Sequence, residues 1–262
     1  MKTKDVATWN RDAWDRRVAQ GDRWTVPFDP KTIDEARDGS FSILLTPTIP
    51  VPMSWFGEIS GSDVLCLASG GGQQAPVLAA AGASVTVLDN SPAQLKQDAM
   101  VAEREALSIR LEHGLMQDLA RFGDQSFDLV FHPCSNSYVA NILPTWSEAH
   151  RVLRPKGTLL SGFANPLRYL FDQEAEERGE LRITHTIPYS DVEALSTEGL
   201  QRLTETGDGV EFGHSLNDQI GGQIDAGFSI TGFYEDRFLG NPNSIDAYIA
   251  TFIATRAVKG RP

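Results

Sequence analysis

Three consecutive glycines and a later aspartate are the residues whose types and spacing point most directly to chemistry. Gly70, Gly71 and Gly72 follow an apolar run, and their lack of a Cβ lets the backbone approach a ligand closely. Asp89 lies 17 residues beyond Gly72, at the end of a second apolar run. A carboxylate there can accept hydrogen bonds from both hydroxyls of a ribose. The pattern therefore predicts a nucleoside-binding site.

The glycine turn alone does not decide which nucleoside is bound. The dinucleotide fingerprint is G-x-G-x-x-G, and here its third glycine position is Ala75, a variant that the fingerprint allows. On this pattern by itself, an NAD(P)-binding oxidoreductase explains the turn and Asp89 equally well. Other parts of the chain have to decide between the classes.

Reactive side chains also follow the apolar run Phe127–Phe131. His132 is the first residue after it, and Cys134 and Asn136 come shortly afterwards. Imidazole titrates near neutral pH, so His132 is the candidate general base; a structural histidine bonded to a loop carbonyl is the alternative. No base partner can be named for Cys134, which favours a pocket wall over a nucleophile. The other histidines lack the spacing of a metal site, so no metal is expected.

Alternating strand and helix patterns must position these residues. Apolar runs predict strands at Val64–Leu67, Ser84–Leu88, Ile109–Glu112, Phe127–Phe131 and Thr158–Phe163. Helical patterns lie between them at Gln73–Ala81, Pro92–Leu107 and Leu143–Leu153, and a turn is expected at Arg154–Gly157. This alternation predicts parallel pairing with right-handed crossovers.

The C-terminal part of the chain follows a different pattern. A helix is expected at Leu216–Ala226, followed by strands at Phe228–Glu235 and Tyr248–Thr255. The connection between these strands is too short for a crossover helix, so they should pair antiparallel. The sequence therefore predicts an α/β fold with a Rossmann-like, seven-stranded, mostly parallel sheet, an antiparallel C-terminal strand and helices on both faces. A dehydrogenase does not show such a closing hairpin.

Two segments stand outside this alternation. Residues 5–20 have helical spacing and carry Trp14, and Trp24 follows in an extended stretch; the segment is expected to pack on the domain, to act as a lid over the ligand, or both. Residues 167–213 form an insertion that shapes a substrate pocket, with a helix expected at Gln173–Gly179 and a strand at Leu181–Ile187. Tyr189 and His214, in or beside it, are weaker candidates for the general base.

Composition narrows the function classes. The formal net charge of −12 argues against a nucleic-acid partner, because phosphate binding needs clustered Lys and Arg. No apolar run reaches about 18 residues, so no membrane span is expected. The start of the chain has no apolar segment typical of a secretory signal. Two cysteines are too few for a disulfide framework, which favours a soluble, cytoplasmic protein.

Taken together, the tracts LCLASGGG, VTVLDNSPAQL, SFDLVF, EAHRVLRPKGTLL and DAGFSITGFYED resemble the class I S-adenosylmethionine-dependent methyltransferases. The resemblance covers roughly Asp63–Phe163 and Leu216–Val258. It implies a methyltransferase domain over residues 61–262, preceded by an N-terminal helical or lid segment over residues 1–60. It also implies that S-adenosylmethionine binds at the carboxyl edge of the first, second and fourth strands.

The resemblance assigns roles to single residues. Ala68, Gly70 and Gly72 would form the turn under the methionine part, Asp89 would hold the ribose, and Asn90 and Met116 would border the adenine. The family often has an Asp after Gly114 that bonds the adenine; here Leu115 follows, and Asp118 is expected to substitute. Facing the reacting methyl group would be Pro133, Cys134 and Asn136. The expected substrate-binding residues are Trp14, Trp24, Cys134, Asn136, Tyr189 and His214.

The expected function is methyl transfer to a small-molecule acceptor by in-line displacement. A sulfonium methyl group is already activated, so the protein contributes mainly alignment of nucleophile, carbon and leaving sulfur. Two alternatives remain on the sequence alone. One is the NAD(P)-binding oxidoreductase, and the other is a non-catalytic, methyltransferase-like binding module.

Overall fold

A seven-stranded sheet in the order β3-β2-β1-β4-β5-β9-β8 forms the centre of the computed structural model, which describes residues 3–172, 175–176, 178–240 and 244–260. Strands β1 to β5 pair in parallel, and β9 runs antiparallel to both β5 and β8, as predicted. The strands are β1 Asp63–Leu67, β2 Ser84–Asp89, β3 Ile109–His113, β4 Phe127–His132, β5 Leu153–Ala164, β8 Phe228–Asp236 and β9 Phe252–Lys259.

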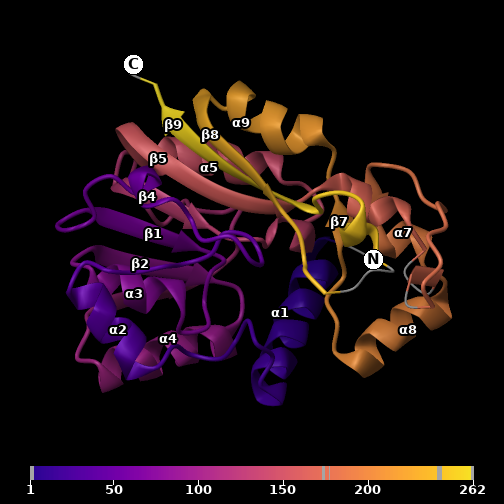
Figure 1. Cartoon of the computed structure of the whole chain (residues 1–262), viewed down its shortest axis with the longest axis horizontal. Coiled ribbons are helices and arrows are strands. Elements are labelled where there is room, and N and C mark those ends of the chain that lie inside the picture. The colour runs from indigo at the N-terminus through magenta and orange to yellow at the C-terminus, as the bar shows by residue number, and fades with distance from the viewer. Residues whose placement is uncertain (1–2, 173–174, 177, 241–243, 261–262) are drawn as a thin grey trace.

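Alternate residues of β1 enter two separate cores, because successive side chains of a strand point to opposite faces. Val64 and Cys66 belong to one core, and Leu65 and Leu67 belong to the other. Helices cover both faces of the sheet, with α2, α3 and α4 on one side and α5 and α9 on the other (Figure 1). Their bounds are α2 Pro30–Arg37, α3 Gln74–Ala80, α4 Pro92–Arg104, α5 Leu143–Val152 and α9 Gly222–Asp225.

Two predicted boundaries differ from the structure for local reasons. The turn expected at Arg154–Gly157 lies inside β5, where the Arg154 guanidinium binds Asp63 and Asp128 of two neighbouring strands at 2.8 Å each. The last strand begins at Phe252, because residues 245–247 form a short 3-10 helix. A π-helical turn, Asn217–Gly221, opens the predicted helix before α9. The sequence reading missed α2.

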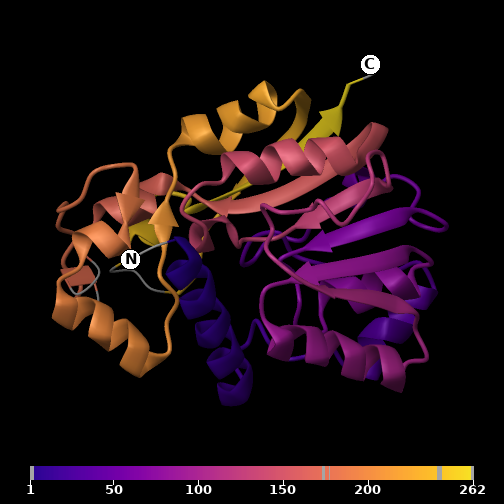
Figure 2. The same cartoon turned by 180° about the vertical axis from the view of Figure 1, so that it is seen from behind.

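Helix α1 (Thr3–Gln20) stands between the sheet and the segment that contains α7 (Asp191–Ala194) and α8 (Thr197–Thr206), as both views show (Figures 1 and 2). On the sheet side, the Asp15 carboxylate accepts from the Ser91 hydroxyl at 2.6 Å. On the other side, the Arg17 guanidinium binds Asp208 at 2.8 Å. The predicted N-terminal helix is therefore confirmed, and polar bonds hold it on both sides.

The 167–213 segment is less regular than predicted. The strand expected at Leu181–Ile187 is wrong: within it only Ile183 makes a bridge, to Phe171. Parts of the helix expected at Gln173–Gly179 lie outside the described residues. A small separate sheet instead joins β6 (Tyr189–Ser190) to β7 (Phe212–Gly213). Among the described residues, no helix has the length and apolar character needed to cross a membrane.

Candidate active site

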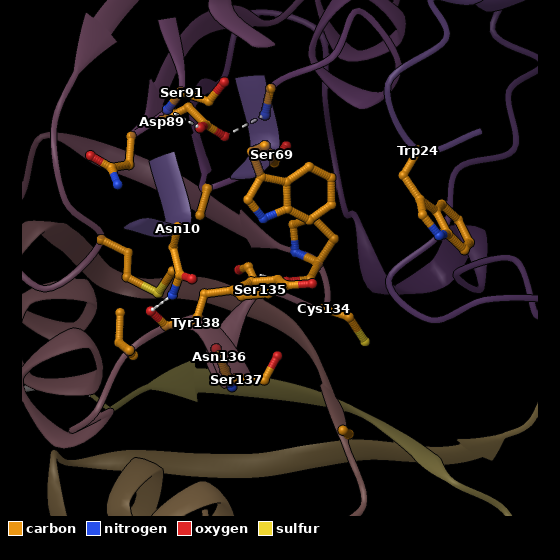
Figure 3. Close-up of a pocket in the computed structure, with 18 of the residues that line it drawn as sticks. Asn10, Trp24, Ser69, Asp89, Ser91, Cys134, Ser135, Asn136, Ser137 and Tyr138 are labelled. Atoms are coloured by element: carbon orange, nitrogen blue, oxygen red, sulfur yellow. Dashed lines mark hydrogen bonds between the residues drawn. The ribbon is translucent and has the colours of Figure 1, made fainter. Parts of the chain in front are cut away.

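A cavity of about 330 Å³ opens at the carboxyl edge of β1, β2 and β4. Residues that follow each of these strands line it, as expected for a ligand site of an open α/β sheet. Helix α1 and the end of the 167–213 segment supply further walls. In the view of Figure 3, Asp89, Ser91 and Ser69 gather at one end, and Asn136 and Ser137 lie at the other.

The glycine turn is held by carboxylates on two elements. The Gly70 N–H donates to Asp89 at 2.9 Å, and the Gly71 and Gly72 N–H groups donate to Asp98 of α4 at 3.2 and 2.9 Å. A Cβ on Gly70 would lie only 2.8 Å from the Gln94 Cβ, so a side chain there would displace its neighbour. The backbone conformation of the turn is thus fixed before any ligand binds.

Asp98 was missed by the sequence reading, although the sequence carries a signal for it. Gln94, Asp98 and Val101 lie at i, i+4 and i+7 on the buried stripe of α4, where a carboxylate is unusual. Burial raises the pKa of Asp98 well above its ordinary value, and the hydrogen bonds from the glycine turn oppose this shift. Gly72 bonds Asp98 and packs on α4, and it does not line the cavity.

Asp89 lines the cavity and keeps hydrogen-bonding capacity on both oxygens. Its Oδ2 accepts from the Gly70 N–H at 2.9 Å and its Oδ1 from the Ser91 N–H at 2.8 Å (Figure 3). Because each carboxylate oxygen has two lone pairs, one on each remains for a ligand hydroxyl. Burial raises the pKa of Asp89, while the backbone N–H groups of Ser91, Gly70 and Asn90 lower it. The carboxylate is thus preset to accept a pair of hydrogen bonds.

The loops after β2 and β3 form another part of the wall. Asn90 and Met116 line the cavity, and the Asn90 amide also donates to the Ala7 carbonyl of α1 at 2.7 Å. Asp118 does not reach this cavity, because its carboxylate turns back to accept from the Ala120 N–H at 3.2 Å. Gln117 lies in the wall instead, and its buried amide oxygen has no partner among the described residues.

His132 is not brought to the cavity. The imidazole is fully buried, its Nδ1 lies 2.8 Å from the Leu67 carbonyl oxygen, and its Nε2 is paired with the Asn136 side chain. Burial lowers the pKa of His132, while these two partners raise it. The arrangement is that of the structural alternative, a histidine bonded to a backbone carbonyl. Asn136, which His132 helps to hold, does line the cavity.

The structure brings together some of the predicted substrate-binding residues. Trp14, Trp24 and Asn136 line the cavity, as do Pro133 and Cys134. Tyr189 and His214 do not: the Tyr189 hydroxyl donates to Asp191 at 2.7 Å, and the His214 Nε2 lies 3.0 Å from the Asn136 carbonyl oxygen.

Many residues of the cavity wall were not foreseen, among them Asn10, Tyr138, Arg168, Tyr169 and Glu211. They come from segments far apart in the chain and belong to no motif, so no spacing pattern could have grouped them. Only the fold places α1, the loop after β4 and the 167–213 segment around one space.

Comparisons with known proteins agree with this geometry. A methyltransferase domain model matches residues 65–161. The chain is 53% identical over 250 residues to the uncharacterised methyltransferase YbaJ of Bacillus subtilis (strain 168). This match covers 95% of this chain and 97% of that protein.

Solved structures share the fold at lower identity. An S-adenosylmethionine-dependent methyltransferase from Mesorhizobium loti has a TM-score of 0.57 at 18% identity, covering 79% of this chain and 94% of that one. Another is the structure of the 1,6-didemethyltoxoflavin-N1-methyltransferase of Burkholderia thailandensis with bound 1,6-didemethyltoxoflavin and S-adenosylhomocysteine. It has a TM-score of 0.60 at 13% identity, and the match covers 99% of this chain and 91% of that one. The chain belongs to the methyltransferase family, and its fold is that of the class I S-adenosylmethionine-dependent methyltransferases.

Proposed function

We propose that S-adenosylmethionine is the methyl donor and that the protein transfers its methyl group to a small molecule held inside the cavity. The observation that carries this proposal is that one cavity joins Asp89 and the glycine turn to Arg168 and Glu211, under the wall supplied by α1. Its volume of about 330 Å³ falls in the range of small-molecule sites. The net charge of −12 also disfavours a nucleic-acid acceptor.

The residues present fit the donor. Gly70 lines the cavity without a side chain, and Asp89 offers a free lone pair on each oxygen for the ribose hydroxyls. Gln94 and Gln117 line the same cavity, and each has a buried amide oxygen without a partner among the described residues. Because an unpaired buried polar atom is costly, these oxygens favour a ligand with N–H donors. We assign Gln117, in place of Asp118, to the amino group of the adenine.

The chain's own contribution to the reaction is alignment and exclusion of water. When bound, the donor supplies a sulfonium-activated methyl group. The acceptor's nucleophilic atom forms its bond to the methyl carbon as the carbon–sulfur bond breaks, and its proton passes to water. Asp89 and the glycine turn hold one side of this geometry, and Trp14 and Asn10 of α1 cover the cavity.

Two measurements test the proposal. In titration calorimetry, S-adenosylhomocysteine should bind with a free energy on the order of −8 kcal/mol, and NADH should not bind. With donor carrying a labelled methyl group and a cell extract, the label should enter the ultrafiltrate of small molecules. Label confined to protein or RNA would overturn the small-molecule acceptor, and retention of configuration from a chiral methyl group would overturn in-line displacement.

A further inference from the structure

Besides Asp89, two charged side chains in the cavity wall, Arg168 and Glu211, have no ionic partner among the described residues. Arg168 lies just after β5, and Glu211 lies just before β7. In the part of the chain that the structure describes, no carboxylate lies within 4.0 Å of the Arg168 guanidinium, and no cationic group lies within that distance of Glu211. A charge left unpaired beside an apolar wall is a costly arrangement unless a ligand compensates it.

The Arg168 guanidinium is placed by aromatic rings. Its central carbon lies 5.9 Å from the ring centroid of Phe238 and 5.7 Å from that of Phe252, and these two rings pack edge to face. Both phenylalanines also line the cavity. Stacking orients the planar group but leaves its N–H donors free in the described part of the chain, in a fork that matches an oxyanion.

Glu211 is placed by hydrogen bonds. Its Oε2 accepts from the Tyr169 hydroxyl at 2.7 Å, and its backbone N–H donates to Asp191 at 2.7 Å. The Tyr169 ring in turn stacks on Tyr189, with ring centroids 5.5 Å apart. Among the described residues, Oε1 of Glu211 has no hydrogen-bond partner. That oxygen is therefore available to an O–H or N–H donor of a ligand.

Both charges border the same space. Burial raises the pKa of the Tyr138 hydroxyl. The negative charges of Glu211 and Asp208 raise it further, and the positive charges of Arg17 and Arg168 oppose them. The Tyr138 side chain lies in the cavity wall with Arg168, Glu211 and Tyr169. Apolar side chains complete this end, among them Leu45 and Phe252.

We infer that the acceptor is a small amphoteric molecule, with an oxyanion that pairs with Arg168, an amine or hydroxyl that donates to Glu211, and an apolar body between them. This inference rests on the proposed function and narrows its substrate class. A neutral lipid-like acceptor would leave both charges unpaired. A purely anionic acceptor would meet Glu211, and like charges repel in a cavity of low polarity.

The test uses the full chain saturated with S-adenosylhomocysteine and a panel of hydroxy- and amino-substituted aromatic and aliphatic carboxylates. Each carboxylate is paired with its neutral amide and with its phosphate counterpart. Binding is measured as the rise in Tm and then by calorimetry. We expect at least one carboxylate or phosphate to bind, and its amide to bind about tenfold or more weakly. The two acidic series identify which oxyanion is preferred.

Variants then connect binding to the two residues. Arg168→Met should remove the preference for acid over amide, and Arg168→Lys should restore it in part. Glu211→Gln should weaken binding of the hydroxy- or amino-substituted acid. It should not weaken binding of the same acid without its hydroxyl or amino group. Arg110→Gln, on the exposed side of β3, is the control and should change nothing.

S-adenosylhomocysteine affinity separates the possible failures. The inference is overturned, and the proposed function stands, if the wild type and every variant bind S-adenosylhomocysteine but no acid binds. The same holds if an acid and its amide bind equally well to the wild type and to Arg168→Met. If the wild type does not bind S-adenosylhomocysteine, the proposed function itself fails.

Discussion

Replacing Asp89 with alanine tests how the donor ribose is held. The carboxylate already accepts one backbone N–H on each oxygen, and each oxygen retains one lone pair toward the cavity. Hydrogen bonds to a charged group contribute about 1.5–3 kcal/mol each, so losing a ribose pair costs at least about 3 kcal/mol. This corresponds to about a hundredfold or more in Kd. Titration calorimetry with S-adenosylhomocysteine measures the change.

The fold should survive this substitution. Asp89 lies in the cavity wall, so water can reach the Gly70 and Ser91 N–H groups once the carboxylate is removed. We expect the ligand-free variant to melt within a few degrees of the wild type. Asp118→Ala is the matched control, because Asp118 is an exposed carboxylate near the cavity that does not line it. Equal affinity of Asp89→Ala and Asp118→Ala would refute the assignment of Asp89 to the ribose.

Three further predictions concern the lid, the packing and the buried acid. Deleting residues 1–24 removes the α1 wall and should weaken S-adenosylhomocysteine binding in calorimetry while the remaining core still melts cooperatively; unchanged affinity would reduce α1 to packing. In Gly162→Ala the new Cβ would lie 2.1 Å from the Leu45 carbonyl oxygen, so urea unfolding should show a loss of about 1–3 kcal/mol, whereas Gly123→Ala has room and should show almost none. Burial raises the pKa of Asp98 well above 3.8 in the folded state, so the folded protein holds this proton more tightly than the unfolded chain. The stability that the protonated carboxyl contributes is therefore fully present below about pH 4, the unfolded-state pKa, and is lost as the pH rises through the folded-state pKa. Asp98→Asn should therefore flatten the fall in unfolding free energy above about pH 4, and an identical pH slope in both proteins would contradict this.

The sheet and its glycine turn could be predicted from sequence because local signals specify them. Buried strands read as continuous apolar runs, and the glycines and Asp89 follow such runs directly. The antiparallel pairing of β8 and β9 could be predicted because the connection between them is too short for a crossover helix. The ends of strands could not be predicted where tertiary contacts decide them. An example is the start of β5, where the ion pairs of Arg154 hold the chain against neighbouring strands.

The acceptor side of the cavity could not be predicted in the same way. Arg168 and Glu211 lie near opposite ends of the irregular 167–213 segment, and neither belongs to a periodic pattern. His132 shows the converse difficulty. It is the last residue of β4, next to the cavity, but its ring is buried against Trp146 of α5, on the face of the strand that Val130 also occupies.

The two-sided attachment of α1 has a consequence for the timing of synthesis. The Asn10 amide donates to the Val210 carbonyl at 3.0 Å, across 200 residues of chain. Helix α1 leaves the ribosome well before its partners near residues 208–210 have been made. At about 5–20 residues per second, this delay is roughly 10–40 s. During that interval the glycine turn and Asp89 can form while α1 is held only on the sheet side, so a nascent or truncated chain lacks the wall that the 167–213 segment gives to the cavity.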